Sequence, residues 1–87
     1  MQLALTYDAP KDLSHSEQRV RLMRMLLAAY HRGEYVTNVD CIQAGLSNFR
    51  SRFSEMRTDL RKQGWTISYG EYARKGLYKY MLMKLEA

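Results

Sequence analysis

The stretch LSNFRSRFSEMRTDLRKQGWTI, residues 46–67, decides the fold of this 87-residue chain. Its apolar residues fall within roughly 60° of one another on a helix drawn at about 100° per residue: Phe49, Phe53, Met56 and Leu60. Small hydroxyl residues and one lysine lie opposite them: Ser47, Ser51, Ser54, Thr58 and Lys62. We expect Ser47 to be the N-cap and Gly64 to take a positive φ just after the helix. The pattern predicts a capped helix with a polar outer face.

The residues before this helix predict a shorter helix joined to it by a tight turn. Tyr35-Val36-Thr37 has β-type character, and Thr37 or Asn38 is then expected to cap a helix of about two turns. The residues expected to be buried in that helix are Val39, Cys41 and Ile42. Gly45 can take the positive φ that the turn needs, with Leu46 tucked beneath it. A short helix, a glycine turn and a capped polar helix together form the helix-turn-helix pattern.

The outer face of the longer helix carries the side chains that DNA readout requires. Short polar groups let a helix backbone approach base edges in a major groove, whereas a purely solvated face more often carries Glu and Lys. The residues expected to read bases are Ser47, Asn48, Arg50, Ser51 and Ser54. Thr58, Arg61 and Lys62, farther along, are expected to contact phosphates or to be solvated. The alternative is the solvated face of an ordinary helix.

Arg52 and Arg57 lie at the two borders of the apolar stripe rather than opposite it. We expect both to serve the structure, with their stems along the core and their guanidinium groups paired with carboxylates or carbonyls. The seven tyrosines are expected to be mostly core and strand residues, because none has an activating partner in the sequence.

After Gly64 the period changes from helical to strand-like. Residues 65–69 alternate apolar with polar, and residues 77–85 are rich in Tyr, Leu and Met. Residues 70–76, bounded by glycines, are expected to form the turn of a β-hairpin. This hairpin would be the wing of a winged helix, with Arg74 and Lys75 placed to meet phosphates or to enter a minor groove. Alternatively, these two bases only keep a loop soluble.

The net charge of +5 is unevenly distributed along the chain. Up to Phe49 five bases balance five acids, whereas from Arg50 onward nine bases face four acids. An asymmetry of this kind is the expected footprint of a surface that contacts phosphates. Acidic proteins or an anionic membrane could use the same charge, but no basic amphipathic helix with exposed Trp or Phe supports membrane binding.

The length of the chain limits the number of domains and the classes of function. Eighty-seven residues make one domain, too small for most active-site clefts, and no acid/base constellation indicates an enzyme.

Residues 1–13 are expected to be an arm or a short extra strand. Ser14 and Glu17 fit a capping box that opens a helix running to His31 or Arg32. The residues of that helix expected to face the core are Val20, Met23, Leu26, Leu27 and Tyr30.

Targeting signals, metal ligands and disulfides have no support in the sequence. The apolar runs are far shorter than the about 20 residues of a membrane span, and the start lacks the features of a signal peptide. Cys41 is the only cysteine, and the two histidines, His15 and His31, have no metal-ligand spacing. We therefore expect a soluble, cytoplasmic protein without cofactor or metal.

Three segments also resemble a known family: RSRFSEMR at residues 50–57, GWTI at 64–67 and YKYML at 78–82. They are similar to the small phage and prophage helix-turn-helix family, whose signature is approximately S-R-I-S-E-L-R, then G-x-x-I, then a Tyr-rich last strand. The resemblance covers about residues 17–85. Phe53 and Met56 stand where that signature usually has Ile and Leu. The resemblance implies a winged helix-turn-helix module that binds DNA, and it identifies neither an operator nor a partner.

The expected architecture is α+β, a winged helix-turn-helix of three helices and a small antiparallel sheet over residues 14–87. The expected function is sequence-specific binding of double-stranded DNA in a bacterial host cell, by a phage-type transcriptional regulator or an architectural, excisionase-like factor. The alternative is a phage-encoded inhibitor or adaptor that binds a host or phage protein, such as an anti-CRISPR or other anti-defence protein. No heptad or second apolar helix face indicates a homodimer.

Overall fold

A computed structural model describes residues 14–85, which form three helices and five short strands. The helices are α1 (His15–Arg32), α2 (Asn38–Gln43) and α3 (Phe49–Arg61). The strands are β1 (Val36–Thr37), β2 (Trp65–Ile67), β3 (Glu71–Arg74), β4 (Leu77–Tyr80) and β5 (Leu82–Lys84). This is the α+β class that the sequence predicts, with three helices and small antiparallel sheets. The arm expected over residues 1–13 lies outside the described residues.

Helix α1 begins and ends where its sequence signals predict. The Ser14 hydroxyl accepts from the Glu17 amide at 3.2 Å, and the Glu17 carboxylate accepts from the Ser14 amide at 2.8 Å. Gly33 ends the helix in the left-handed conformation. None of the described helices is long and apolar enough to cross a membrane.

The buried side of α1 differs from the expected one. The buried residues are Leu22, Leu26 and Ala29, whereas Val20, Leu27 and Tyr30 are exposed, so only Leu26 was predicted correctly as a fully buried residue. Met23 is partly buried against the core. The reason is that α1 carries two neighbouring apolar stripes, and helical periodicity alone cannot say which one faces α3 and the strands.

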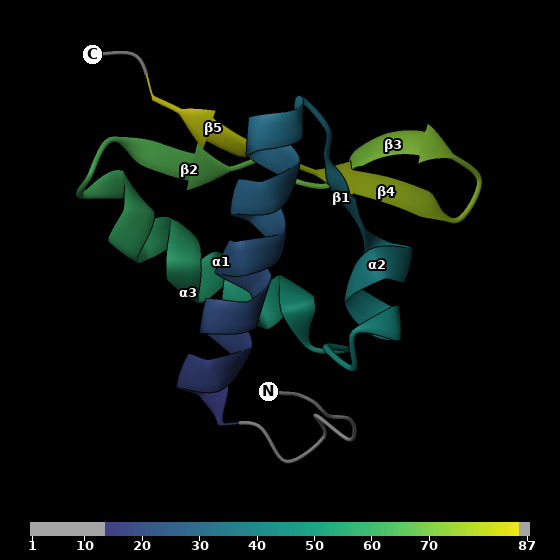
Figure 1. The fold of residues 1–87 in the computed structure, drawn as a ribbon, viewed down its shortest axis with the longest axis horizontal. Helices are drawn as coiled ribbons and strands as arrows, with labels where there is room; N and C mark the ends of the chain where they lie inside the picture. The colour runs from purple at the N-terminus through teal and green to yellow at the C-terminus, as the bar shows by residue number, and fades with distance from the viewer. Residues whose placement is uncertain (1–13, 86–87) are drawn as a thin grey trace.

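The strands form two antiparallel sheets, β1-β4-β3 and β2-β5, which follow one another along a single bent hairpin. β3 pairs with β4, β2 pairs with β5, and β1 pairs with β4 through Val36 opposite Tyr80. At the bend, the Ser68 amide donates to the Met81 carbonyl and the Met81 amide donates to the Ser68 hydroxyl, each at 2.9 Å. In Figure 1 the strands occupy the upper part of the view, α1 crosses in front, and α2 and α3 lie below.

Two strand predictions need correction. The expected turn over residues 70–76 is mostly β3, and only Lys75 and Gly76 form the turn, because residues 71–74 pair with β4. The expected continuous strand over residues 77–85 is interrupted at Met81, where the hairpin bends.

The core is centred on an aromatic cluster that joins α3 to β4. Phe53 and Tyr80 have ring centroids 5.0 Å apart, and Phe49 packs edge-on against Tyr80 at 5.6 Å. Leu46 lies beneath the turn between α2 and α3, where Gly45 has the predicted positive φ. The aromatic cluster therefore fixes the position of α3 relative to the hairpin.

Helix α2 buries only one of the three residues expected to be buried. Cys41 is fully buried, whereas Val39 and Ile42 are exposed by 40% and 56%. A six-residue helix presents little more than one side to the core, so an apolar residue one position away from the buried one points outward.

Candidate nucleic-acid interface

The start of α3 differs in one detail from the prediction. Asn48, not Ser47, is the N-cap, and its side chain makes no capping hydrogen bond. The Phe49 amide donates to the Leu46 carbonyl at 3.2 Å, and the Ser51 amide donates to the Asn48 carbonyl at 3.1 Å. Because backbone carbonyls satisfy these first amides, the hydroxyl of Ser47 is not needed as a cap. Ser47 and Asn48 are both exposed at the end of the helix.

The predicted binding residues of α3 all lie on its exposed side. The buried residues of the helix are Phe49, Arg52, Phe53 and Met56. The predicted residues on and around α3 are all exposed: Ser47, Asn48, Arg50, Ser51, Ser54, Thr58, Arg61 and Lys62. Lys62 is the C-cap of the 13-residue helix, about 20 Å from Asn48 at the other end. The helix could therefore present this set to one extended partner.

The two acidic residues of α3 are turned toward α1. Glu55 pairs with Arg19 of α1 at 2.6 Å and with Arg52 at 3.2 Å. Asp59 lines an apolar groove between the two helices, together with Val20 and Leu60. The opposite side of α3 therefore carries basic and hydroxyl side chains without a carboxylate among them.

Arg52 and Arg57 serve the structure, as the sequence predicts. Arg52 is 7% exposed and contacts Glu55, while its Nε and Nη1 atoms have no hydrogen-bond partner. Arg57 donates through Nε to the Ile67 carbonyl at 2.7 Å and through Nη2 to the Ser68 carbonyl at 2.6 Å. Burial lowers the pKa of Arg57, an effect that the neighbouring tyrosines oppose. Arg57 thus joins α3 to the end of β2 through neutral carbonyls, so its positive charge is not cancelled there.

Tyr69 contacts two arginines of α3, and no signal in the sequence singled it out. Its side chain is 72% exposed, yet the Arg57 guanidinium lies 4.0 Å from its ring centroid and Arg61 Nη2 lies 3.2 Å from its hydroxyl. The alternation from Trp65 to Tyr69 suggested a residue on the same side as buried Ile67. The expected alternation fails in β2 and just after it, because Thr66 and Ser68 are buried as well as Ile67, and the strand ends at Ile67, before Tyr69. Of the other described tyrosines, Tyr30 and Tyr35 are exposed and lie outside the strands, contrary to the expected core or strand role, whereas exposed Tyr72 is a strand residue of β3.

The hairpin β3–β4 carries the other predicted contacts. Arg74 and Lys75 are exposed at its tip, which projects beyond α2 on the right of Figure 1, away from the C-terminal end of α3. Asn38 of α2 holds this hairpin: its Nδ2 donates to the Gly76 carbonyl at 3.1 Å and its Oδ1 accepts from the Tyr78 amide at 2.8 Å. The predicted residues therefore fall into two groups, one along α3 and one at the hairpin tip.

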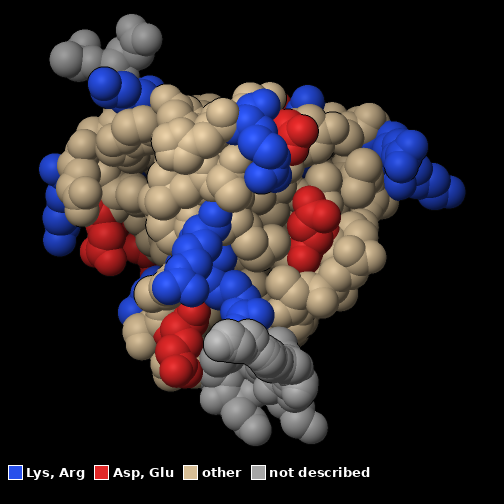
Figure 2. Space-filling model, in the orientation of Figure 1, with Lys and Arg blue, Asp and Glu red and all other residues tan. Residues whose placement is uncertain are grey.

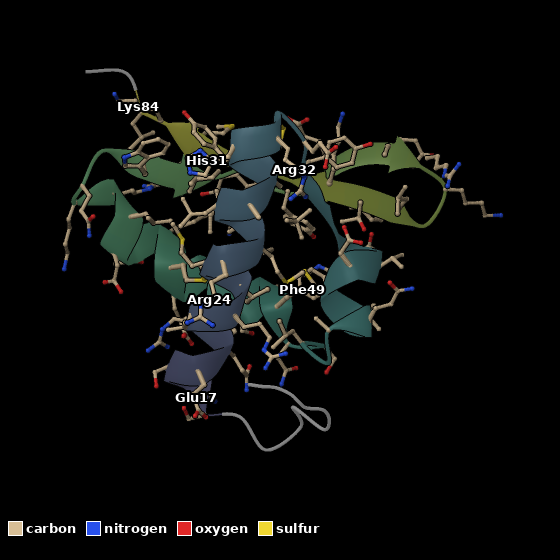
Figure 3. All side chains as sticks on the ribbon, viewed as in Figure 1. Glu17, Arg24, His31, Arg32, Phe49 and Lys84 are labelled. Carbon is tan, nitrogen blue, oxygen red and sulfur yellow. The ribbon has the colours of Figure 1, made fainter. Side chains whose placement is uncertain are left out.

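The face that α1 presents differs from the outer side of α3. Lysines and arginines alternate there with acidic residues (Figure 2), and Arg24 lies on this face with Glu17 near the start of α1 and Arg32 near its end (Figure 3). Within residues 14–85, no cluster of three or more His, Cys, Asp or Glu residues could hold a metal ion.

No protein-family model, curated protein or solved structure gives a significant match to the chain. The resemblance to the phage and prophage family therefore stays an expectation from the sequence, and the geometry must support any functional conclusion by itself.

Proposed function

We propose that this chain binds double-stranded DNA as a winged helix-turn-helix, with α3 as the recognition helix and the β3–β4 hairpin as the wing. The observation that carries the proposal is the one-sided charge of α3. Glu55 and Asp59 face α1, whereas Arg50 and Arg61 lie on a side that has hydroxyl groups and no carboxylate. A polyanion can approach this side of α3 without meeting a carboxylate of the helix.

The order of the elements also supports this proposal. α2 and α3 are joined by a short turn with Gly45 at positive φ, and β1, just before α2, pairs with the hairpin that follows α3. In helix-turn-helix proteins the N-terminal residues of the second helix contact base edges. Asn48 and Ser51 occupy that position here, and Arg50 between them could form a bidentate pair with a guanine edge.

Rigid support behind the exposed residues is a further argument. Phe49 and Phe53 anchor α3 in the core, and Arg57 ties its middle to the carbonyls that follow β2. A recognition surface on a rigid helix holds its polar groups in place before binding and so loses less entropy on binding. The setting we propose is that of a phage-type regulator or architectural factor in the bacterial cytoplasm.

Selection of bound duplexes from a random pool tests the proposal. We expect one duplex sequence to be preferred over bulk DNA by roughly 10³-fold or more. A chain that binds no duplex, or all duplexes equally, would not be a sequence-specific DNA-binding protein.

A second candidate function, binding a host or phage protein as an inhibitor or adaptor, is favoured by one observation. The groove between α1 and α3, about 300 Å³, is lined mainly by apolar side chains, including Met23 and half-exposed Val20. Apolar surface of this kind is typical of protein contacts. If this were the function, Val20→Glu would abolish binding of the protein partner and Arg50→Ala would not. The DNA proposal expects Arg50→Ala to weaken duplex binding and Val20→Glu to leave it unchanged.

A further inference from the structure

A hollow of about 350 Å³ lies where the C-terminal half of α3 meets the connection between β2 and β3. It is lined by Ser54, Arg57, Thr58, Arg61 and Tyr69. All five side chains carry hydrogen-bond donors and none is acidic. Its volume is at the small end of the range for ligand pockets, so it suits a small group rather than a large organic ligand.

Contacts within the hollow leave some hydrogen-bond donors of its side chains unused. The Tyr69 hydroxyl oxygen lies 3.2 Å from Arg61 Nη2 and accepts its hydrogen, which leaves the tyrosine O–H free to donate. Arg57 donates hydrogen bonds to backbone carbonyls through Nε and Nη2. Its third guanidinium nitrogen, Nη1, is left to donate to a ligand. The carbonyls and the ring are neutral, so two guanidinium charges face the hollow without a counter-ion among its lining residues.

Tyr69 organises this arrangement although it is exposed. A tyrosine that is 72% exposed is normally free to change rotamer, because little packing holds it. Here its ring lies against Arg57 and its hydroxyl lies beside Arg61, so one side chain fixes two arginines one helical turn apart. Thr58 adds little to this order, because its hydroxyl makes only a long contact of 3.5 Å with the Ser54 carbonyl.

We propose that this hollow binds a phosphate oxyanion, with Arg61, Arg57 and the Tyr69 hydroxyl as donors and the whole Tyr69 side chain, through its ring and its hydroxyl, as the group that positions the two arginines. This inference rests on the proposed function and deepens it, because in the complex the oxyanion is a backbone phosphate of the DNA. A phosphate contact at the C-terminal half of α3 would set the register of the helix while its first turn reads bases.

Three variants test the hollow against a control. Tyr69→Ala removes the ring and the hydroxyl, Tyr69→Phe removes only the hydroxyl, and the control Tyr30→Ala removes another exposed tyrosine, which lies on α1 and packs against Trp65. Affinity for a random-sequence duplex is measured by fluorescence anisotropy. Binding of inorganic phosphate is followed separately through the NMR signals of the Arg57 and Arg61 side chains.

We expect Tyr69→Ala to weaken duplex binding about tenfold, the size of one charge-assisted hydrogen bond, and Tyr69→Phe to weaken it by a smaller factor. Tyr30→Ala should stay within about twofold of the wild type, since exposed side chains away from the contact contribute little. Inorganic phosphate should shift the arginine signals in the wild type and leave them unshifted in Tyr69→Ala.

Equal duplex affinities of Tyr69→Ala and Tyr30→Ala would overturn the inference while leaving DNA binding intact. If the wild type bound no duplex, the proposed function would fail and the phosphate titration would decide on the hollow alone. Shifts of the arginine signals would then support a site for a free phosphate group, and unshifted signals would overturn it.

Discussion

Neighbouring residues of α3 have separate tasks. Phe53 is 1% exposed and packs on Tyr80, whereas Arg50, less than one turn away, is exposed and lies with its guanidinium 4.9 Å from the Phe49 ring centroid. Changes at the two positions should therefore affect different properties of the protein, stability at one and binding at the other.

Phe53→Ala should lower the free energy of unfolding by roughly 3–5 kcal/mol, because it opens a cavity in the aromatic cluster. Arg50→Ala should change stability by less than about 0.5 kcal/mol, since its side chain is at the surface. On the preferred duplex, Arg50→Ala should cost about 1–3 kcal/mol of binding and relax the base choice at one position. Urea unfolding and duplex titrations measure the two effects. If folded Arg50→Ala binds every duplex as the wild type does, α3 does not read bases through this residue.

Cys41 should behave as an inert thiol. Burial, with a smaller effect of the Asp40 carboxylate, raises its pKa from 9.0 to about 12, so the thiol stays protonated in the folded protein where an exposed one would ionise. The unfolded chain loses this proton first as the pH rises. Stability contributed by Cys41 is therefore present below pH 9 and lost as the pH approaches 12.

A comparison of the wild type with Cys41→Ala checks this expectation. The wild type should lose stability more steeply than the variant in the alkaline range, because both chains share every other titrating group. At pH 8 a thiol reagent should label Cys41 slowly in the native protein and rapidly in denaturant. Fast labelling of the native protein would show that the thiol is accessible.

Among the elements, the ends of α1 and the start of α2 follow local signals, whereas the start of α3 and the buried faces of α1 and α2 do not. The capping boxes at Ser14 and Thr37 are readable from the sequence because each needs only residues three positions apart. The buried stripe of α1 depends on how α3 and the strands pack, which is not local information. The polar face of α3 could be predicted from its own sequence. Tyr69 was expected to be a core or strand residue but is exposed beside α3, because its contacts are with residues of that helix.

Asn38→Ala tests how the hairpin is held against α2. Its side chain makes two hydrogen bonds to the hairpin, so we expect a loss of about 1–2 kcal/mol of stability and faster hydrogen exchange at the Tyr78 amide. Asn48→Ala is the matched control, because Asn48 is an N-cap whose side chain makes no capping bond. Equal losses for the two variants would mean that the Asn38 contacts do not stabilise the hairpin.

The hairpin tip can be tested without disturbing the fold. Changing both Arg74 and Lys75 to Ala should weaken binding to all duplex sequences about equally. The slope of the logarithm of the binding constant against that of salt concentration should become shallower by roughly one or two units. Thermal unfolding should hardly change, because exposed charges contribute little to folding. A slope identical to that of the wild type would show that the tip is only a turn.

At the scale of the whole molecule, the two faces carry charge in different ways. On the α1 face bases and acids alternate (Figure 2), whereas the outer side of α3 and the hairpin tip together offer five exposed bases from the predicted site: Arg50, Arg61, Lys62, Arg74 and Lys75. The sequence shows that all of the net charge follows Phe49. It does not show that Glu55 and Asp59 turn away from these bases, because that depends on the packing of α3 against α1.

The salt dependence of duplex binding tests the central claim most directly, namely that the acid-free side of α3 and the hairpin tip bind DNA. Neutralising about five phosphates predicts a slope of −4 to −5 when the logarithm of the binding constant is plotted against that of salt concentration. Arg61→Ala should make the slope shallower by about one unit, whereas Arg24→Ala, an equal loss of charge on α1, should leave it unchanged. Binding that is independent of salt, or equal effects of the two variants, would contradict the claim.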